Sequence, residues 1–580
     1  MKKTAAFVLG ALFLASCQQV GGWFGEKEKK DSTATVTAPA GAAALLRDES
    51  ITPENAYSDL FLDSAAVEAY IGREKIDGDK AGRMRAFYRV RNNQFAWFSS
   101  DGPTEQARGL WSLYESKAGE LKNRPPESLQ ERMDSLLTRD TSFIALRNGF
   151  TPNGPARPHA ATSNDTASAY SDSAHLHSDP ALIQTELALT AQFVNLAGEA
   201  RSNISPDHLY WMVPRKKMDP LQLADSLLHK EQDSSMWRNN TRYSSLRNSL
   251  NTYYESARTG GWPAVSATGL KPGVRSATVV QLKKRLAATG DYPAGDTSDM
   301  YSDSLRTAVK AVQEQYGLRP TGLVTDSLQR ALNVPAVERV QQILVNMNRA
   351  LWLPAPADSG IYINIPSQEL LAYSDSGAAL RMPVIVGKEG SGTMAFSDRI
   401  TTVVFNPYWN IPKSIVARQI KPAMDKDPKY LQKHHMEVVR QNDSLPQLRQ
   451  LPGNDNALGR VKFLFPNSFD IYLHDTPHKE LFGQRNRALS NGCIRVAQPD
   501  TLAAYVLRGQ AGWTPEKIAA AMKGDKEQQV AVQQPVPVSI SYYTAWPAAN
   551  GKLHFRNDIY GYDRQTTSRM FLPAATAARM

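Results

Sequence analysis

Between Phe469 and Val496 the chain reads FDIYLHDTPHKELFGQRNRALSNGCIRV, and the rest of the molecule can be understood around this segment. Its first six residues alternate apolar and polar side chains and end at His474, a pattern typical of a β-strand. A Ser-Asn-Gly turn then leads to Cys493, one of only two cysteines among 580 residues. A histidine at a strand end and a cysteine in a glycine turn could form a thiol–imidazole pair for acyl transfer.

The alternation predicts where these side chains point, because neighbours along a strand face opposite sides of a sheet. In FDIYLH the apolar residues share one face and His474 lies on the other. In GCIRV the same rule places Cys493 and Arg495 on one face and Ile494 and Val496 on the other. We therefore expect the thiol Sγ and a ring nitrogen of the histidine within hydrogen-bonding reach, or slightly beyond it in an empty site.

Length and composition describe a multidomain globular protein. The chain is too long for one hydrophobic core and suggests about three or four domains. Hydrophobic residues make up 42% and charged residues 21%, with a net charge of +10 spread along the chain. A basic balance suits nucleic acid, anionic lipid or an acidic polymer. The sequence has no basic tail, zinc-finger spacing or aromatic RNA-binding motif, so nucleic acid ranks low as a partner.

The N-terminus resembles the signal peptide of a bacterial lipoprotein. Two lysines precede an apolar run that is too short to span a bilayer, and the run ends in LASC at Cys17. The resemblance implies cleavage before Cys17 and attachment of acyl chains to it, which would hold the protein at a membrane. The alternative is an ordinary secretory signal with an incidental cysteine. If Cys17 is lipidated, Cys493 is the one free thiol of an exported protein and is either inert or chemically active.

Helical periodicity dominates residues 51–268, which we interpret as a scaffold domain. A break near 148–179 is rich in Pro, Ser, Ala, Thr and Asp and reads as a disordered insertion. Its HLH motif lacks a third ligand, so we expect no metal site there. Residues 269–333 read as three short helices with glycine stops, and their pattern resembles the small peptidoglycan-binding domain of many cell-wall enzymes. The alternative is a generic three-helix bundle.

After a connecting helix in 334–357 the period changes to alternating, β-branched runs, which predict a sheet-rich domain over 358–525. A polar, partly helical stretch near 413–459 interrupts the strands just before the reactive segment. Its position suits a lid over a site. An insertion on the surface of the domain is an equally good interpretation.

The segments HDTP and RALSNGCIRV resemble the signature of L,D-transpeptidases, in which a histidine precedes an S-x-G-C-x-R element. The wider match includes NPYWNIPKSIV at 406–416, NALGRVKFLFPN at 456–467 and the C-terminal SYYTAWP and RNDIYGYD. Together with the other two domains, it resembles the large, lid-bearing L,D-transpeptidases of Gram-negative bacteria over most of Ile51 to Asp563.

The fold class that follows is multidomain α+β: a helical scaffold, a three-helix peptidoglycan-binding domain and a β-sheet-rich L,D-transpeptidase-type catalytic domain with a lid insertion. The expected order is signal peptide and lipobox 1–17, flexible tether 18–50, scaffold 51–268, peptidoglycan-binding domain 269–333, connecting helix 334–357, catalytic domain 358–525 with its lid near 413–459, and C-terminal strands and tail 526–580.

The resemblance assigns roles to the reactive segment. It implies that Cys493 is the nucleophile, that His474 is the general base and acid, and that Arg495 lies near the acyl-binding site. Gly492 and Cys493 would supply backbone amides to the oxyanion. Ser490 matches the small hydroxyl residue that opens the motif.

The remaining site residues are substrate-binding candidates. Asn491 stands where many smaller family members have a histidine, so a second motif imidazole is absent. Tyr408 and Trp409 resemble an aromatic segment lining the substrate cleft, and a role in the core suits them equally well.

The implied reaction joins two diaminopimelate residues of peptidoglycan. The thiol attacks the bond between diaminopimelate and the terminal D-Ala of a tetrapeptide stem, D-Ala leaves, and a second stem takes the acyl group from the thioester. No metal or organic cofactor is required, and other cell-wall synthesis enzymes are possible partners. The implied location is the periplasm-facing cell envelope. Alternatives are an L,D-carboxypeptidase, an enzyme that anchors proteins to peptidoglycan, a non-enzymatic wall-binding lipoprotein and a papain-like protease. The last is disfavoured because its cysteine precedes its histidine.

Overall fold

The computed structural model describes residue 48 and residues 50–116, 125–138, 179–199, 206–229, 240–352, 359–374, 377–441, 445–548 and 550–573. The chain forms two compact units. The first comprises residues 1–111, 119–355 and 543–580, and the second comprises residues 112–118 and 356–542. The predicted signal peptide with Cys17, almost all of the tether, and nearly all of the insertion near 148–179 lie outside the described residues.

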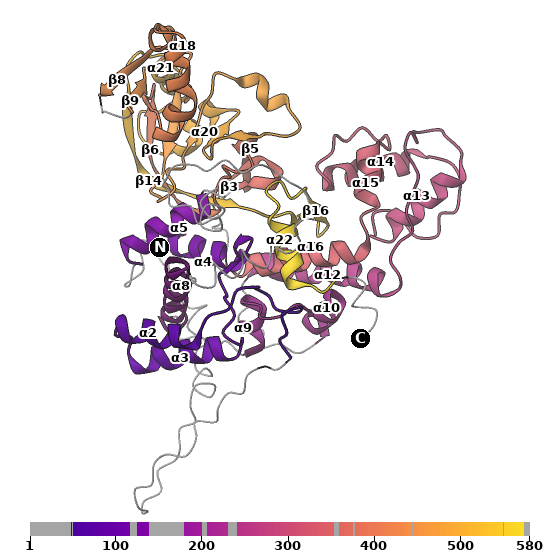
Figure 1. Ribbon diagram of the computed structural model, residues 1–580. Coiled ribbons are helices and arrows are strands. Elements are labelled where there is room, and N and C mark those ends of the chain that lie inside the picture. The colour runs from indigo at the N-terminus through magenta and orange to yellow at the C-terminus, as the bar shows by residue number, and fades with distance from the viewer. Residues whose placement is uncertain are drawn as a thin grey trace, which may run out of the picture. The chain divides into compact units, whose positions relative to one another are not determined.

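The first unit is mainly helical, as the periodicity predicted (Figure 1). Its N-terminal helices are α2 (Ser64–Arg73), α3 (Gly78–Arg89), the part of α4 (Glu105–Ser116) up to Trp111, α5 (Glu127–Thr138), α8 (Pro180–Glu199), α9 (Pro206–Met212), α10 (Pro220–His229) and α12 (Thr241–Arg258). Its short strands are β1 (Phe98–Ser99) and β2 (Gly102–Pro103). None of the described helices is both long and apolar enough to cross a membrane.

Three short helices form the part that we expected to bind peptidoglycan. They are α13 (Ala277–Ala287), α14 (Asp303–Gln315) and α15 (Asp326–Leu332), and they share one apolar core. The hydroxyl of Thr325 accepts a hydrogen bond from the Leu328 N–H and caps α15. The connecting helix follows as α16 (Ala336–Ala350).

The C-terminal segment returns to α16 within the same unit. It contains β15 (Ala545–Pro547), β16 (Leu553–Phe555) and α22 (Tyr562–Met570), whose apolar residues join a core shared with α10, α12 and α16. The buried guanidinium of Arg349 pairs with Glu105 at 2.7 Å and with Asp563 at 2.5 Å. Removing one member of such a network leaves an uncompensated buried charge.

The second unit is built on a nine-stranded sheet in the order β12-β5-β13-β11-β10-β6-β14-β3-β4. An additional pairing between β4 and β5 closes the sheet on itself. Its strands are β3 (Gly360–Asn364), β4 (Glu369–Ser374), β5 (Gly377–Gly387), β6 (Phe396–Phe405), β10 (Val461–Leu464), β11 (Leu473–His474), β12 (Ala488–Ser490), β13 (Ile494–Val496) and β14 (Gln528–Ser541). Figure 1 shows β14 running beside β6 and β3.

The remaining elements of this unit are mostly short. They are η2 (Ile365–Ser367), η4 (Lys479–Gly483), α20 (Pro499–Val506) and α21 (Pro515–Met522), together with the elements of the insertion described below.

Two details differ from the sequence analysis. The residues expected together as C-terminal strands and tail, 526–580, are divided, because β14 pairs between β6 and β3 while β15, β16 and α22 pack in the first unit. The strand expected over Phe469–His474 is limited to Leu473–His474. Asp470 has a left-handed backbone with φ of 54°, which breaks the extended alternation before the strand begins.

Candidate active site

The neighbouring strands β11 and β13 bring the reactive segment together. They run parallel, with Leu473 opposite Ile494 and His474 opposite Arg495. Leu473 and Ile494 are fully buried on one face of the sheet. The register therefore places the side chains of His474, Arg495 and, one residue before the strand, Cys493 on the other face, as the alternation predicted.

A row of three basic side chains crosses this face. Antiparallel pairing of β10 with β11 places Lys462 opposite His474, and Arg495 lies opposite the same histidine from the other side. Lys462 and Arg495 are both half-buried. Neither forms an ion pair with a described residue, and the buried Nε of Arg495 has no hydrogen-bond partner. Two cations without an ion pair among the described residues flank the imidazole and form a site suited to an anionic ligand.

His474 is buried and oriented by its own loop. Its Nδ1 lies 2.5 Å from the backbone oxygen of Asp475. Because a carbonyl oxygen only accepts, Nδ1 carries the proton and donates, which leaves Nε2 as the unprotonated acceptor of the neutral ring. Burial, and then the charge of Arg495, lower the pKa of His474 to about 3. The imidazole is therefore neutral at pH 7 and able to accept a proton.

The thiol of Cys493 is partly exposed, and its S–H donates to the backbone oxygen of Asp470 at 3.6 Å. Burial raises the pKa of this thiol to about 11, and hydrogen bonding from Tyr472 opposes that rise. The thiol is therefore protonated at pH 7. The thiol and His474 share a face but form no hydrogen bond with each other, so both start in their neutral forms.

The turn that carries Cys493 is fixed by hydroxyl groups. Ser490 Oγ donates to the backbone oxygen of Cys493 at 2.6 Å and accepts from the Gly492 N–H at 3.2 Å. Thr393 Oγ1 donates to the Gly492 oxygen at 2.7 Å. Gly492 has φ of 122°, a conformation that favours glycine. We had expected the amides of both Gly492 and Cys493 to face an oxyanion; here the Gly492 N–H is engaged by Ser490, and the Cys493 N–H makes no hydrogen bond.

Asp475 anchors the loop that orients His474, and we had not singled it out. Its buried carboxylate accepts from the backbone N–H groups of Thr476 at 2.7 Å and Arg460 at 2.8 Å, and it pairs with Lys479. A Cβ on Gly459 would lie 2.4 Å from its carboxyl carbon. Only glycine therefore fits at position 459, where φ is also 61°. The HD pair was visible in the sequence, but the groups that bind Asp475 depend on the fold.

Comparison with known proteins shows which domains this unit is similar to. Residues 358–530 match the family model of the L,D-transpeptidase catalytic domain. This part of the chain is therefore similar to L,D-transpeptidase catalytic domains. Residues 82–250 match a scaffold domain, and residues 275–332 match a peptidoglycan-binding domain. These matches confirm the expected fold class.

One similar curated protein is named "Putative L,D-transpeptidase" and comes from Haemophilus influenzae. The two are 36% identical over 241 residues, which cover 39% of this chain and 48% of that protein, so the matched part spans about half of the relative.

The solved structures that resemble the chain include an L,D-transpeptidase from Mycobacterium smegmatis, with 12% identity over 32% of this chain and 60% of that one and a TM-score of 0.18. Another is an L,D-transpeptidase from Stackebrandtia nassauensis, with 13% identity over 47% of this chain and 95% of that one and a TM-score of 0.19.

The insertion in the catalytic domain is a folded subdomain. It contains α17 (Lys413–Ile415), η3 (Val416–Ile420), α18 (Lys421–Lys426), α19 (Tyr430–Lys433), β8 (Met436–Arg440) and β9 (Gln447–Gln450), and β9 also pairs with β7 (Trp409–Asn410). Ile411, Val416, Ile420 and Leu448 form its apolar core. Residues separated by a long polar stretch thus meet in one small sheet.

The predicted aromatic residues belong to this subdomain. Trp409 packs against its apolar core, and Tyr408 lies under the guanidinium of Arg449 at 4.3 Å. Neither makes a hydrogen bond or ring contact with Cys493 or His474 in the described structure. Asn491 is exposed at the turn. Across the described residues, no group of three or more His, Cys, Asp or Glu side chains could hold a metal ion.

Proposed function

We propose that the catalytic domain is an L,D-transpeptidase that cross-links peptidoglycan stems through a thioester on Cys493. The observation that carries the proposal is the strand register, which places the thiol, the imidazole of His474 and the unpaired guanidinium of Arg495 on one face of the sheet. The matches to catalytic and peptidoglycan-binding domains support the substrate class and a location in the cell envelope.

The first half-reaction begins when a tetrapeptide stem places a carboxylate near Arg495. The added negative charge offsets the repulsion that lowers the pKa of His474, so the imidazole becomes a stronger base when substrate binds. Nε2 of His474 then accepts the thiol proton as Sγ attacks the carbonyl carbon between diaminopimelate and D-Ala. The developing oxyanion accepts a hydrogen bond from the free Cys493 N–H. The C–N bond breaks, His474 returns the proton to the amine, and D-Ala leaves.

The second half-reaction resolves the thioester. The side-chain amine of diaminopimelate on another stem attacks the acyl carbon, His474 takes a proton from that amine, and the proton returns to sulfur as the C–S bond breaks. The products are a cross-linked pair of stems and the free thiol. Water as acceptor would instead give a tripeptide, and a protein lysine would give an anchored protein.

Incubation of the purified full chain with disaccharide-tetrapeptide, followed by mass spectrometry, tests the proposal. A cross-linked dimer formed with loss of D-Ala, absent for Cys493→Ala, is the expected result. Tripeptide as the sole product would replace the transpeptidase by a carboxypeptidase, and an unchanged tetrapeptide would rule out both.

We further propose, from the lipobox, that acyl chains on Cys17 anchor the protein to a membrane. Growth of expressing cells with radiolabelled palmitate should label the protein, and Cys17→Ala should remove the label. A labelled Cys17→Ala variant would contradict the anchor.

A further inference from the structure

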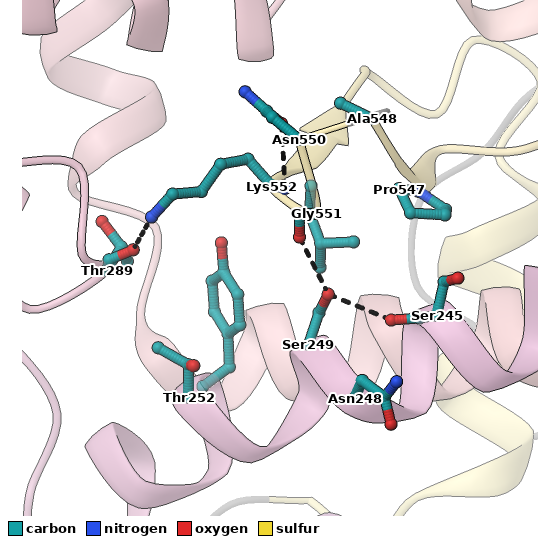
Figure 2. A pocket seen from close by; sticks show the side chains of 12 residues that line it. Ser245, Asn248, Ser249, Thr252, Thr289, Pro547, Ala548, Asn550, Gly551 and Lys552 are labelled. Carbon is teal, nitrogen blue, oxygen red and sulfur yellow. Dashed lines mark hydrogen bonds between the residues drawn. The ribbon is translucent and has the colours of Figure 1, made fainter.

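A polar cavity of about 420 Å³ lies in the first unit, and none of the residues assigned to catalysis lines it (Figure 2). Its walls come from one face of α12, from the turn between β15 and β16, and from Thr289 in the segment that matches a peptidoglycan-binding domain. The volume falls in the range of small-ligand sites, about 300–1,000 Å³.

Hydrogen bonds join the three walls. Ser249 Oγ, on α12, donates to the backbone oxygen of Gly551 at 3.4 Å, which ties the helix to the turn (Figure 2). The Nζ of Lys552 donates to the backbone oxygens of Thr289 at 2.9 Å and Gly290 at 2.7 Å. The turn therefore bridges the scaffold helix and the loop after α13, and the cavity is a built feature of both.

Several groups in the cavity lack a protein partner. The side-chain amide of Asn248 and the hydroxyls of Ser245, Thr252 and Tyr253 make no hydrogen bond with a side chain or backbone group among the described residues. The ring of Tyr253 packs against the rings of Trp262 and Phe555, with centroid separations of 6.1 Å and 5.6 Å. Burial raises the pKa of Tyr253 well above its usual value, so its hydroxyl stays protonated. The cavity thus offers hydrogen-bond donors and acceptors that no described residue occupies.

The charge of the cavity indicates which part of peptidoglycan, the stem peptide or the glycan strand, would bind in it. Lys552 is the one charged side chain among the lining residues that the structure describes. Its ammonium is already used by two carbonyl oxygens and by the carboxylate of Asp291 at 3.6 Å. A stem peptide carries carboxylates that would lose their hydration here without gaining a free cation. A glycan strand carries neutral hydroxyl and acetamido groups, which match the unpartnered groups of the wall.

We propose that this cavity binds the N-acetylated glycan strand of peptidoglycan and so extends the peptidoglycan-binding domain onto the scaffold helix. Hydroxyl and acetamido groups of the sugar bind Asn248, Thr252 and Tyr253, and the methyl of an acetamido group packs on Pro547. This proposal rests on the proposed function only because it takes peptidoglycan as the substrate. It contributes no group to the chemistry at Cys493.

The test is calorimetric titration of the full chain with the β-1,4-linked tetramer of N-acetylglucosamine. Asn248 and Thr252 are exposed and without side-chain partners, so Asn248→Ala combined with Thr252→Ala should fold normally. We expect the double variant to bind at least tenfold more weakly than wild type. Asn251→Ala, an exposed change on the same helix outside the cavity, should bind as wild type. Equal binding by the double variant, or no binding by wild type, overturns the site.

A photoreactive derivative of the same tetramer separates this site from the three-helix domain. Cross-links should fall on α12 or on the turn between β15 and β16, and cross-links confined to α13–α15 would overturn the proposal. Cellotetraose, which lacks the acetamido groups, should compete weakly; equal competition would contradict recognition of those groups. Binding should be retained by Cys493→Ala, so failure of the transpeptidase proposal and failure of this one give different results.

Discussion

Lys462 should set the pH at which His474 loses its function as a base. The two residues are paired across β10 and β11, and the charge of Lys462 contributes to the low pKa of His474, after burial and Arg495. Two unit charges about 6 Å apart at an effective dielectric constant of about 20 repel by about 3 kcal/mol, or roughly two pKa units. Because Lys462 is half-exposed, solvent screening reduces this repulsion energy. Lys462→Gln should therefore raise the pKa of His474 by about one unit.

The assay is the pH dependence of kcat/KM for release of D-Ala from tetrapeptide. A raised pKa protonates His474 at a higher pH, so the acidic limb should move upward in Lys462→Gln and stay in place in Lys462→Arg. Lys526→Gln removes the same charge from an exposed position that does not affect His474 and serves as the matched control. An acidic limb that is unmoved in Lys462→Gln, or that moves equally in Lys526→Gln, would refute the electrostatic role of the row.

Two further substitutions test the packing. Gly459→Ala places a Cβ 2.4 Å from the Asp475 carboxyl carbon. This substitution should lower the free energy of unfolding by about 1–3 kcal/mol and should lower kcat by disturbing His474. Gly453→Ala, whose Cβ would meet nothing within 4 Å, should change neither quantity in the same unfolding and turnover assays. Arg349→Met leaves two buried carboxylates unpaired and should lower the free energy of unfolding by about 3–5 kcal/mol, measured in urea, whereas the exposed Arg258→Met should change it by less than about 1 kcal/mol.

The sequence predicted those features of the site that depend on local alternation. Cys493 and Arg495 share a face because they are two residues apart in an extended segment, and no distant contact is needed to infer it. The same rule failed before His474, because the left-handed Asp470 ends the alternation. That conformation is decided by the turn before β11, which a hydrophobic pattern does not reveal.

Contacts between residues far apart in the chain could not be predicted from the sequence. Lys462 becomes a neighbour of His474 only through the register of β10 and β11. The Gly492 N–H is engaged by Ser490, although both lie in the segment we examined first, because the turn geometry decides which group the hydroxyl faces. The protonation states also depend on the fold, because burial raises the pKa of Cys493, whereas burial and the charge of Arg495 lower the pKa of His474.

In the proposed reaction Cys493 carries the acyl group. Intact-protein mass spectrometry of the wild-type chain after brief exposure to disaccharide-tetrapeptide measures this directly. We expect an adduct equal to the donor minus D-Ala, located by peptide mapping on Cys493, absent in Cys493→Ala and strongly reduced in His474→Gln. An adduct on another residue, or one of equal yield in Cys493→Ala, would contradict it.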